Sequence, residues 1–160
     1  MDNNLLNIIL ETTYTLSQYK KRVKVLNSYL SGKFFQAIKN TENLNLEESK
    51  WLENLPKEFL DSFNKDNLST LMTNLNSQID KTPILTLYLP FEAQDEVLDQ
   101  IGQKVRNTFG ANFLIDIKYN PSLIAGCGLS WKGIYKDYSL HQKITERRLP
   151  ILQSFKKFLR

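Results

Sequence analysis

Residues 119–140 read YNPSLIAGCGLSWKGIYKDYSL, and this stretch decides how the second half of the chain folds. The runs 123–131 and 134–137 are rich in apolar and aromatic residues, which predicts two strands. They meet at Lys132-Gly133, where glycine can supply the positive φ of a tight turn. We therefore expect a β-hairpin.

Turn and cap residues surround the predicted hairpin. Pro121 marks a turn just before it. Gly126 and Gly128 interrupt the first strand and indicate a bulge or a close approach by another backbone. Asp137 or Ser139 is expected to cap a closing helix, because the first amide N–H groups of a helix need an oxygen acceptor.

Upstream, residues 83–118 predict a strand-helix-strand unit. Residues 84–89 form a short apolar run typical of a mostly buried strand. Residues 92–109 carry apolar side chains at helical spacing and end at Gly110, a predicted C-cap. Residues 113–118 again show an alternating pattern of side chains, which predicts the second strand. Such a unit pairs its two strands in parallel and places the helix on one face of the sheet.

The first 81 residues predict a set of short amphipathic helices. Ser31-Gly32 is expected to end the second of them. Asn45 and Glu48 have the spacing of a capping box. The clearest helix of this half is predicted from about residue 66 to residue 80.

Together these patterns predict an α+β protein with two domains. A small helical bundle over residues 1–81 precedes an α/β domain over residues 82–160, whose small mixed sheet combines the strand-helix-strand unit with the hairpin and a closing helix. Pro150 is expected to break the chain before a last amphipathic turn or two. This basic amphipathic tail completes the second domain.

The order of motifs resembles the C-terminal region of the delta subunit of F-type ATP synthases, called the oligomycin sensitivity-conferring protein in mitochondria. That family reads Asp-Pro-Ser-Leu-Ile-Gly-Gly, two short strands, Asp-x-Ser and a leucine-spaced helix. Asn120 and Ala125 replace an Asp and a Gly of the pattern. The resemblance covers about half the chain, and residues 1–81 match only in being helical and fewer than usual. The matching residues are Pro121, Ser122, Leu123, Ile124, Gly126, Asp137 and Ser139.

The resemblance implies a protein without catalysis or cofactor of its own. It would be a peripheral-stalk (stator) subunit that links the catalytic head to the membrane-anchored b subunit during proton-driven ATP synthesis. Its partners would be the N-terminal helix of an alpha subunit and the C-terminal region of the b subunit. Its place would be the cytoplasmic face of a bacterial cell membrane, as a peripheral part of the complex.

The same resemblance suggests two contact regions. In the helical half, Leu68, Leu71, Met72 and Leu75 lie on one side of a helix, where they serve either as bundle core or as the groove for the alpha subunit. The tail, residues 139–160, would contact the stalk. Phe155 and Phe158 are its candidate apolar anchors, with basic residues facing acidic partner positions.

Charge and composition limit the alternatives. Residues 132–160 carry 8 Lys/Arg against 2 Asp/Glu, which leaves 13 against 15 in the rest of the chain. Such a basic tail suits phosphate, anionic lipid or an acidic protein surface. Apolar residues at 41% argue against disorder. The single cysteine, Cys127, excludes an internal disulfide, and no apolar run or secretion signal argues for insertion into a membrane. We expect a soluble, reducing compartment.

The sequence offers little support for an enzyme. His141 is the only histidine, and no Gly-rich phosphate loop of the Walker type is present. The carboxylates of Glu92, Asp95, Glu96 and Asp99 cluster at a predicted helix start, where they complement the helix dipole.

Two other functions fit parts of the chain. Trp131, Tyr135 and Tyr138 lie among Lys132 and Lys136, a mixture that can stack on single-stranded nucleic acid, so a nucleic-acid-binding module is the alternative. The related peripheral-stalk component of V- or A-type ATPases also ends in an α/β domain. That component begins with one long uninterrupted helix, whereas the predicted helices in the first half of this chain are interrupted repeatedly.

Overall fold

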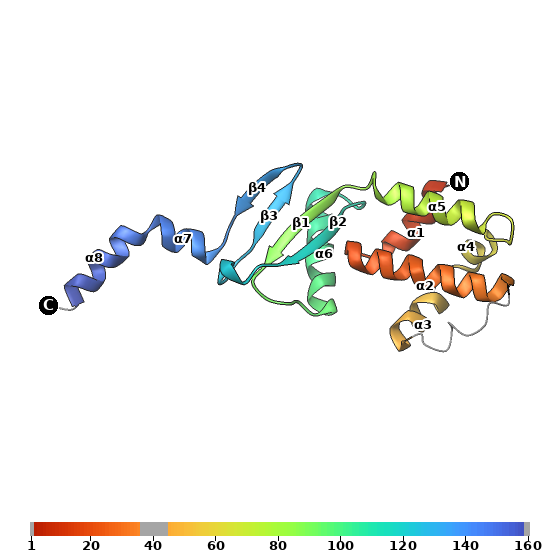
Figure 1. Cartoon of the computed structure of the whole chain (residues 1–160), viewed down its shortest axis with the longest axis horizontal. Coiled ribbons are helices and arrows are strands. Elements are labelled where there is room, and N and C mark those ends of the chain that lie inside the picture. Colours follow the sequence, from red (N-terminus) through yellow and green to blue (C-terminus); the bar gives the residue numbers. More distant parts are fainter. Residues whose placement is uncertain (1, 36–44, 159–160) are drawn as a thin grey trace.

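The computed structural model describes residues 2–35 and 45–158, and it is elongated (Figure 1). A helical half lies at one end and a twisted sheet in the middle. Two consecutive helices at the other end extend away from the sheet. The fold class is therefore α+β, as the sequence predicts. No described helix is both long and apolar enough to cross a membrane.

In the helical half, the described residues form five helices that pack around one apolar core. They are α1 (Asp2–Glu11), α2 (Leu16–Phe35), α3 (Leu46–Glu53), α4 (Lys57–Asp61) and α5 (Leu68–Ile79). Helix α2 is central, because its Tyr19, Leu26 and Leu30 are almost completely buried. The Tyr19 hydroxyl donates a hydrogen bond to the Leu75 carbonyl at 3.0 Å and so joins α2 to α5.

Of two sequence predictions for the helical half, one is confirmed and the other is wrong. The capping box is confirmed, since the Asn45 side chain accepts from the Glu48 N–H at 2.8 Å and Glu48 accepts from the Asn45 N–H at 3.0 Å. The predicted helix end at Ser31-Gly32 is wrong, because α2 continues to Phe35. Phe34 packs against the helical core beyond that point, and this tertiary contact outweighs the low helix propensity of glycine.

The sheet has four strands in the order β2-β1-β3-β4. Strands β1 (Ile84–Leu89) and β2 (Leu114–Tyr119) are parallel and are connected through α6 (Asp95–Phe109), as predicted. Strand β3 (Gly128–Trp131) is antiparallel to both β1 and β4 (Ile134–Asp137). We call residues 84–137 the sheet half.

The two faces of the sheet have different neighbours. Leu87, Leu89 and Ile115 pack in one cluster with Ile101 and Val105 of α6. Leu114 is instead part of the core of the helical half, and its register partner Ile84 packs against the same core. One face of the sheet therefore packs on α6, while the start of β1 and β2 packs on the helical half, which also contacts α6 directly.

The start of the hairpin differs from the sequence expectation. The predicted first strand begins at residue 123, whereas β3 begins only at Gly128. Before it, Pro121–Leu123 form a 3-10 helix, and Ile124 has a φ of 66° that no strand residue adopts. The polar cap at Asn120 starts this short helix and so delays the strand.

The last two helices are α7 (Leu140–Glu146) and α8 (Arg148–Phe158), which we call the tail. The expected break at Pro150 is wrong, because α8 begins two residues earlier. Proline is tolerated there since the first N–H groups of a helix have no intrahelical partner. The division into two domains at residue 82 stays a prediction.

Candidate partner-binding surface

The loop that precedes β3 is ordered by its own side chains. The Asn120 side-chain oxygen accepts from the Ser122 N–H at 3.2 Å, which caps the 3-10 helix. Leu123 is only 4% exposed and anchors the loop in the interior. The Ala125 N–H then donates to the Leu123 carbonyl at 2.7 Å. Four of the motif residues, Pro121 to Ile124, therefore build a compact turn.

This loop holds the start of α7. A Cβ added to Gly126 would lie 2.5 Å from the Tyr138 carbonyl oxygen, so only glycine allows the two segments to approach this closely. The Tyr138 N–H donates to the Cys127 carbonyl at 2.9 Å, and the Leu140 N–H donates to the Ala125 carbonyl at 2.8 Å. The close backbone approach expected at Gly126 is confirmed, and it fixes where the tail leaves the sheet.

Asp137 and Ser139 complete the attachment. Ser139 is fully buried, and its hydroxyl oxygen accepts from the Gln142 N–H at 3.2 Å as the N-cap of α7. The Ser139 N–H donates to an Asp137 carboxylate oxygen at 2.7 Å. Hydrogen bonds from the Ser139 side chain and backbone hold the pKa of Asp137 below its usual value. The Asp-x-Ser element thus orients the tail.

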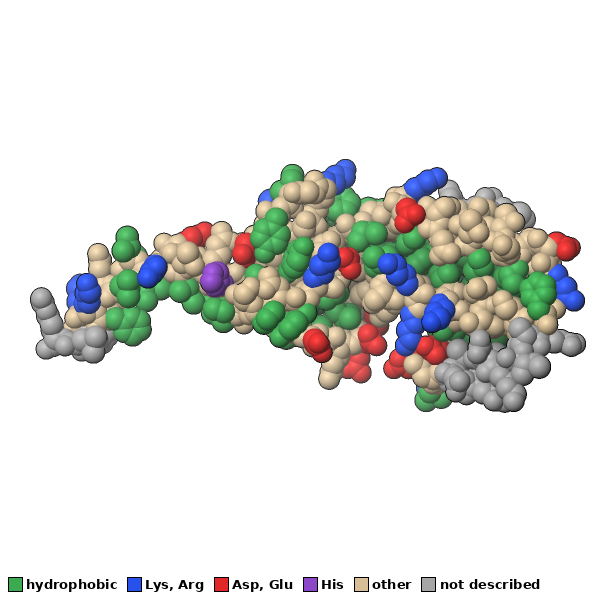
Figure 2. Space-filling model, viewed as in Figure 1, with side chains coloured by type: hydrophobic (Ala, Val, Ile, Leu, Met, Phe, Trp, Pro, Cys, Tyr) green, Lys and Arg blue, Asp and Glu red, His purple; other side chains and the backbone are tan. Residues whose placement is uncertain are grey.

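The tail itself is almost free of contacts with the rest of the protein. From Leu140 to Lys157 no side chain is buried. Phe155 is 62% exposed and Leu149 is 73% exposed, values unusual for such large apolar side chains. Figure 2 shows hydrophobic and basic side chains side by side along it. The exposed apolar residues of the tail are Leu140, Ile144, Leu149, Leu152 and Phe155.

Positive charge accompanies these apolar residues. The tail and the residue between its two helices carry five bases against one acid, Glu146; the bases are Lys143 in α7, Arg147 between the helices, and Arg148, Lys156 and Lys157 in α8. Among the described residues none of these charges forms a salt bridge. The side chain of Phe158, the second predicted anchor, lies outside the described residues. The tail therefore presents an apolar and basic surface that no other described part of the chain covers.

An apolar hollow of about 270 Å³ lies beside the root of the tail. It opens between the end of α6 and the hairpin, on the sheet face that α6 only partly covers. The rings of Phe113 and Trp131 form one wall, with centroids 5.0 Å apart. Tyr138, two residues before α7, also lines it. Sequence reasoning did not find this hollow, because it depends on where α6 stops relative to β4.

The predicted groove residues of α5 are mostly in the core. Leu68, Met72 and Leu75 are between 1% and 7% exposed and belong to the helical core, while Leu71 packs against it. Leu68 and Met72 also form the floor of a hollow of about 320 Å³ between α2 and α5, with half-exposed Phe35 at its rim. Of the two readings that the sequence leaves open, bundle core describes these side chains in the free protein.

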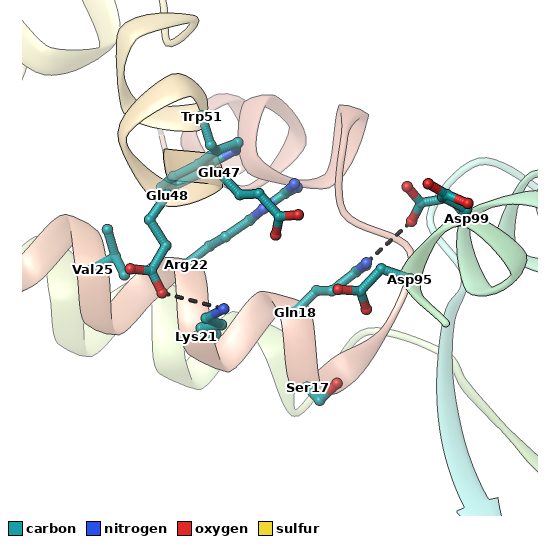
Figure 3. Close-up of a pocket in the computed structure, with 11 residues that line it drawn as sticks. Ser17, Gln18, Lys21, Arg22, Val25, Glu47, Glu48, Trp51, Asp95 and Asp99 are labelled. Atoms are coloured by element: carbon teal, nitrogen blue, oxygen red, sulfur yellow. Dashed lines mark hydrogen bonds and ion pairs between the residues drawn. The ribbon is translucent and has the colours of Figure 1, made fainter. Parts of the chain in front are cut away.

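A polar pocket of about 460 Å³ lies where α2, α3 and the start of α6 meet (Figure 3). Lys21 forms a salt bridge with Glu48 at 3.2 Å, and Gln18 donates to Asp99 at 3.1 Å. The guanidinium of Arg22 lies 5.2 Å from the centre of the Trp51 ring. Among the described residues no three potential ligands are placed to hold a metal ion. Five acids line this pocket against two bases, so it is acidic; the acids are Glu47, Glu48, Asp95, Glu96 and Asp99, and the bases are Lys21 and Arg22.

The aromatic residues of the nucleic-acid alternative have different neighbours, and Tyr135 is 49% exposed. Trp131 packs on Phe113, and Tyr135 forms an edge-to-face pair with Tyr88 at 5.6 Å between centroids. Tyr138 is half exposed at the root of the tail. These positions form two separate clusters rather than one stacking platform.

Comparisons with known proteins return no identification. No protein-family model matches the chain. A search of the curated proteins also finds no match.

Proposed function

We propose that this protein is a stator subunit of an F-type ATP synthase, a non-catalytic link between the catalytic head and the peripheral stalk. The observation that carries the proposal is the tail, an exposed apolar and basic helix pair that the motif residues attach to the sheet. Three of the residues that resemble the delta subunit family, Gly126, Asp137 and Ser139, take part in this attachment. The spacing that matches the family pattern is therefore the spacing that attaches the tail to the sheet.

The stalk partner is the C-terminal region of a b subunit, bound along the tail. Large apolar side chains that remain exposed on a helix gain about 1.5–3 kcal/mol each when a partner buries them. An amphipathic partner helix provides such burial. The basic residues beside Phe155 favour a partner whose rim is acidic. The apolar hollow at the root of the tail extends the same surface.

The head partner is the N-terminal helix of an alpha subunit, bound to the helical half. The hollow between α2 and α5 supports this assignment, because Leu68, Met72 and the exposed Phe35 line it among polar side chains that can bond a partner helix. A static link needs contact area rather than a reactive group. The protein would act at the cytoplasmic face of a bacterial membrane, held there by the complex.

The test is titration calorimetry with a peptide from the C-terminal region of the b subunit. Phe155→Asp is expected to weaken binding at least about tenfold, since it removes one buried apolar anchor. Gln153→Asp adds the same charge at an exposed polar position of α8 and should change the affinity much less. Equal affinity of the wild type and Phe155→Asp would remove the tail from the interface.

A pull-down from gently solubilised native membranes tests the complex as a whole. Recovery of alpha, beta and b subunits in proportion is the expected result. The nucleic-acid alternative predicts instead that single-stranded RNA binds at low salt and dissociates steeply as salt increases, because phosphate contacts release counterions. Fluorescence anisotropy at two salt concentrations separates the two functions.

A further inference from the structure

The segment between α1 and α2 is bound to the sheet half as well as to the two helices that it connects. The Ile115 N–H of β2 donates to the Tyr14 carbonyl at 3.0 Å, and Thr15 pairs with Ile115 in a parallel bridge. Thr13 and Thr15 are at most 1% exposed. The segment thus covers the outer edge of β2, an edge that would otherwise present unpaired backbone groups.

Arg106 of α6 fastens the same segment from the other side. Its guanidinium donates to the Leu10 carbonyl at 2.6 Å and to the Thr13 carbonyl, and its Nε donates to the Phe113 carbonyl at 3.2 Å. The carbonyl of Leu10 belongs to the last turn of α1, where a helix lacks intrahelical donors and attracts positive charge. One side chain therefore joins the end of α1 to the sheet half.

Tyr14 packs directly on α6. A Cβ at Gly102 would collide with the Tyr14 side chain, so the glycine lets the ring lie against the helix backbone. The Arg106 guanidinium lies 4.6 Å from the centre of the same ring, within the range of a cation–π contact. Gln18 adds a hydrogen bond to Asp99 one turn earlier on α6. These contacts connect residues that are far apart in the chain.

We propose that Tyr14, Thr15, Gly102 and Arg106, which we call the clasp, make the helical half and the sheet half a single cooperative unit. Leu114 of β2 also couples the two halves, because it is buried in the core of the helical half. The clasp goes beyond the proposed function, because it holds the two halves at a fixed angle whatever partners they bind. It also predicts that residues 1–81 and 82–160 do not fold independently.

The chain contains only two tryptophans, and each half holds one: Trp51 in α3 and Trp131 in β3. Their native indole N–H signals can be followed together in one sample by ¹H–¹⁵N NMR during a urea titration. The expected result is one midpoint for both signals. Two separate midpoints in the wild-type protein would overturn the proposal.

A variant in each half tests the coupling directly. Arg106→Lys loses the forked hydrogen bonds and is expected to lower both midpoints together, by roughly 0.5–1 M urea. Tyr19→Phe removes the bond to Leu75 inside the helical half and should also shift both signals. Lys104→Ala, at an exposed position of α6, is the control and should shift neither. The proposal would be contradicted if Arg106→Lys lowered the urea midpoint of the Trp131 signal alone. It would also be contradicted if Tyr19→Phe lowered the midpoint of the Trp51 signal alone.

Discussion

Single residues determine where the tail leaves the sheet. Ser139 contributes to this through two separate interactions. Its hydroxyl caps α7, and its side chain and N–H stabilise the ionised form of Asp137. Because the native pKa of Asp137 lies below the usual value of about 3.9, ionisation favours the folded state. This contribution is fully present above that usual value and is lost as the pH falls through the lowered native pKa.

Ser139→Ala is therefore expected to raise the pKa of Asp137 towards its usual value and to destabilise α7 by about 1 kcal/mol. The carboxyl ¹³C resonance of Asp137, followed across the acid range in which carboxylates titrate, measures the first effect. Ser154→Ala, in the exposed part of α8, is the control and should leave the titration unchanged. An Asp137 titration that is the same in Ser139→Ala and in the wild type would contradict this role.

Among the elements, α8 has the weakest tertiary support. It spans Arg148–Phe158, and isolated helices this short are marginal in water. Its amides are therefore expected to exchange with solvent much faster than those of α2, whose side chains form the core. Hydrogen exchange read by mass spectrometry measures the difference. Adding the b-subunit peptide should slow exchange in α8 and leave α2 unchanged, whereas protection in the free protein equal to that of α2 would show that α8 is stable alone.

Sequence patterns predicted elements whose signals are local. The capping box at Asn45 and the turn at Lys132-Gly133 depend on neighbours a few residues apart, and each strand and helix of the strand-helix-strand unit carries its own periodic pattern. The end of α2 did not follow its local signal, because Phe34 packs against a distant part of the core. The clasp was not predicted at all. A glycine within a helix and a lone arginine carry no pattern that points to Tyr14.

At the scale of the whole molecule, the two proposed contact regions lie far apart, with the hollow between α2 and α5 in the helical half and the tail beyond the sheet (Figure 1). A stator resists torque only if its two contacts cannot turn relative to each other. In our proposal, the clasp prevents such rotation between the helical half and the sheet. The hydrogen bonds of Tyr138 and Leu140 to the loop prevent it at the root of the tail.

A fixed angle between the halves can be measured by distances between spin labels. In a Cys127→Ala background, labels at exposed Asn76 in α5 and Lys136 in β4 are expected to give a single narrow distance distribution by double electron–electron resonance. Adding Arg106→Ala should broaden it, because the forked bonds from α6 to the end of α1 are lost. A label pair at Lys20 and Asn76, both in the helical half, is the control and should stay narrow in both backgrounds. A broad distribution between Asn76 and Lys136 with Arg106 intact would mean that the halves move relative to each other, and the clasp would then be too weak to transmit torque.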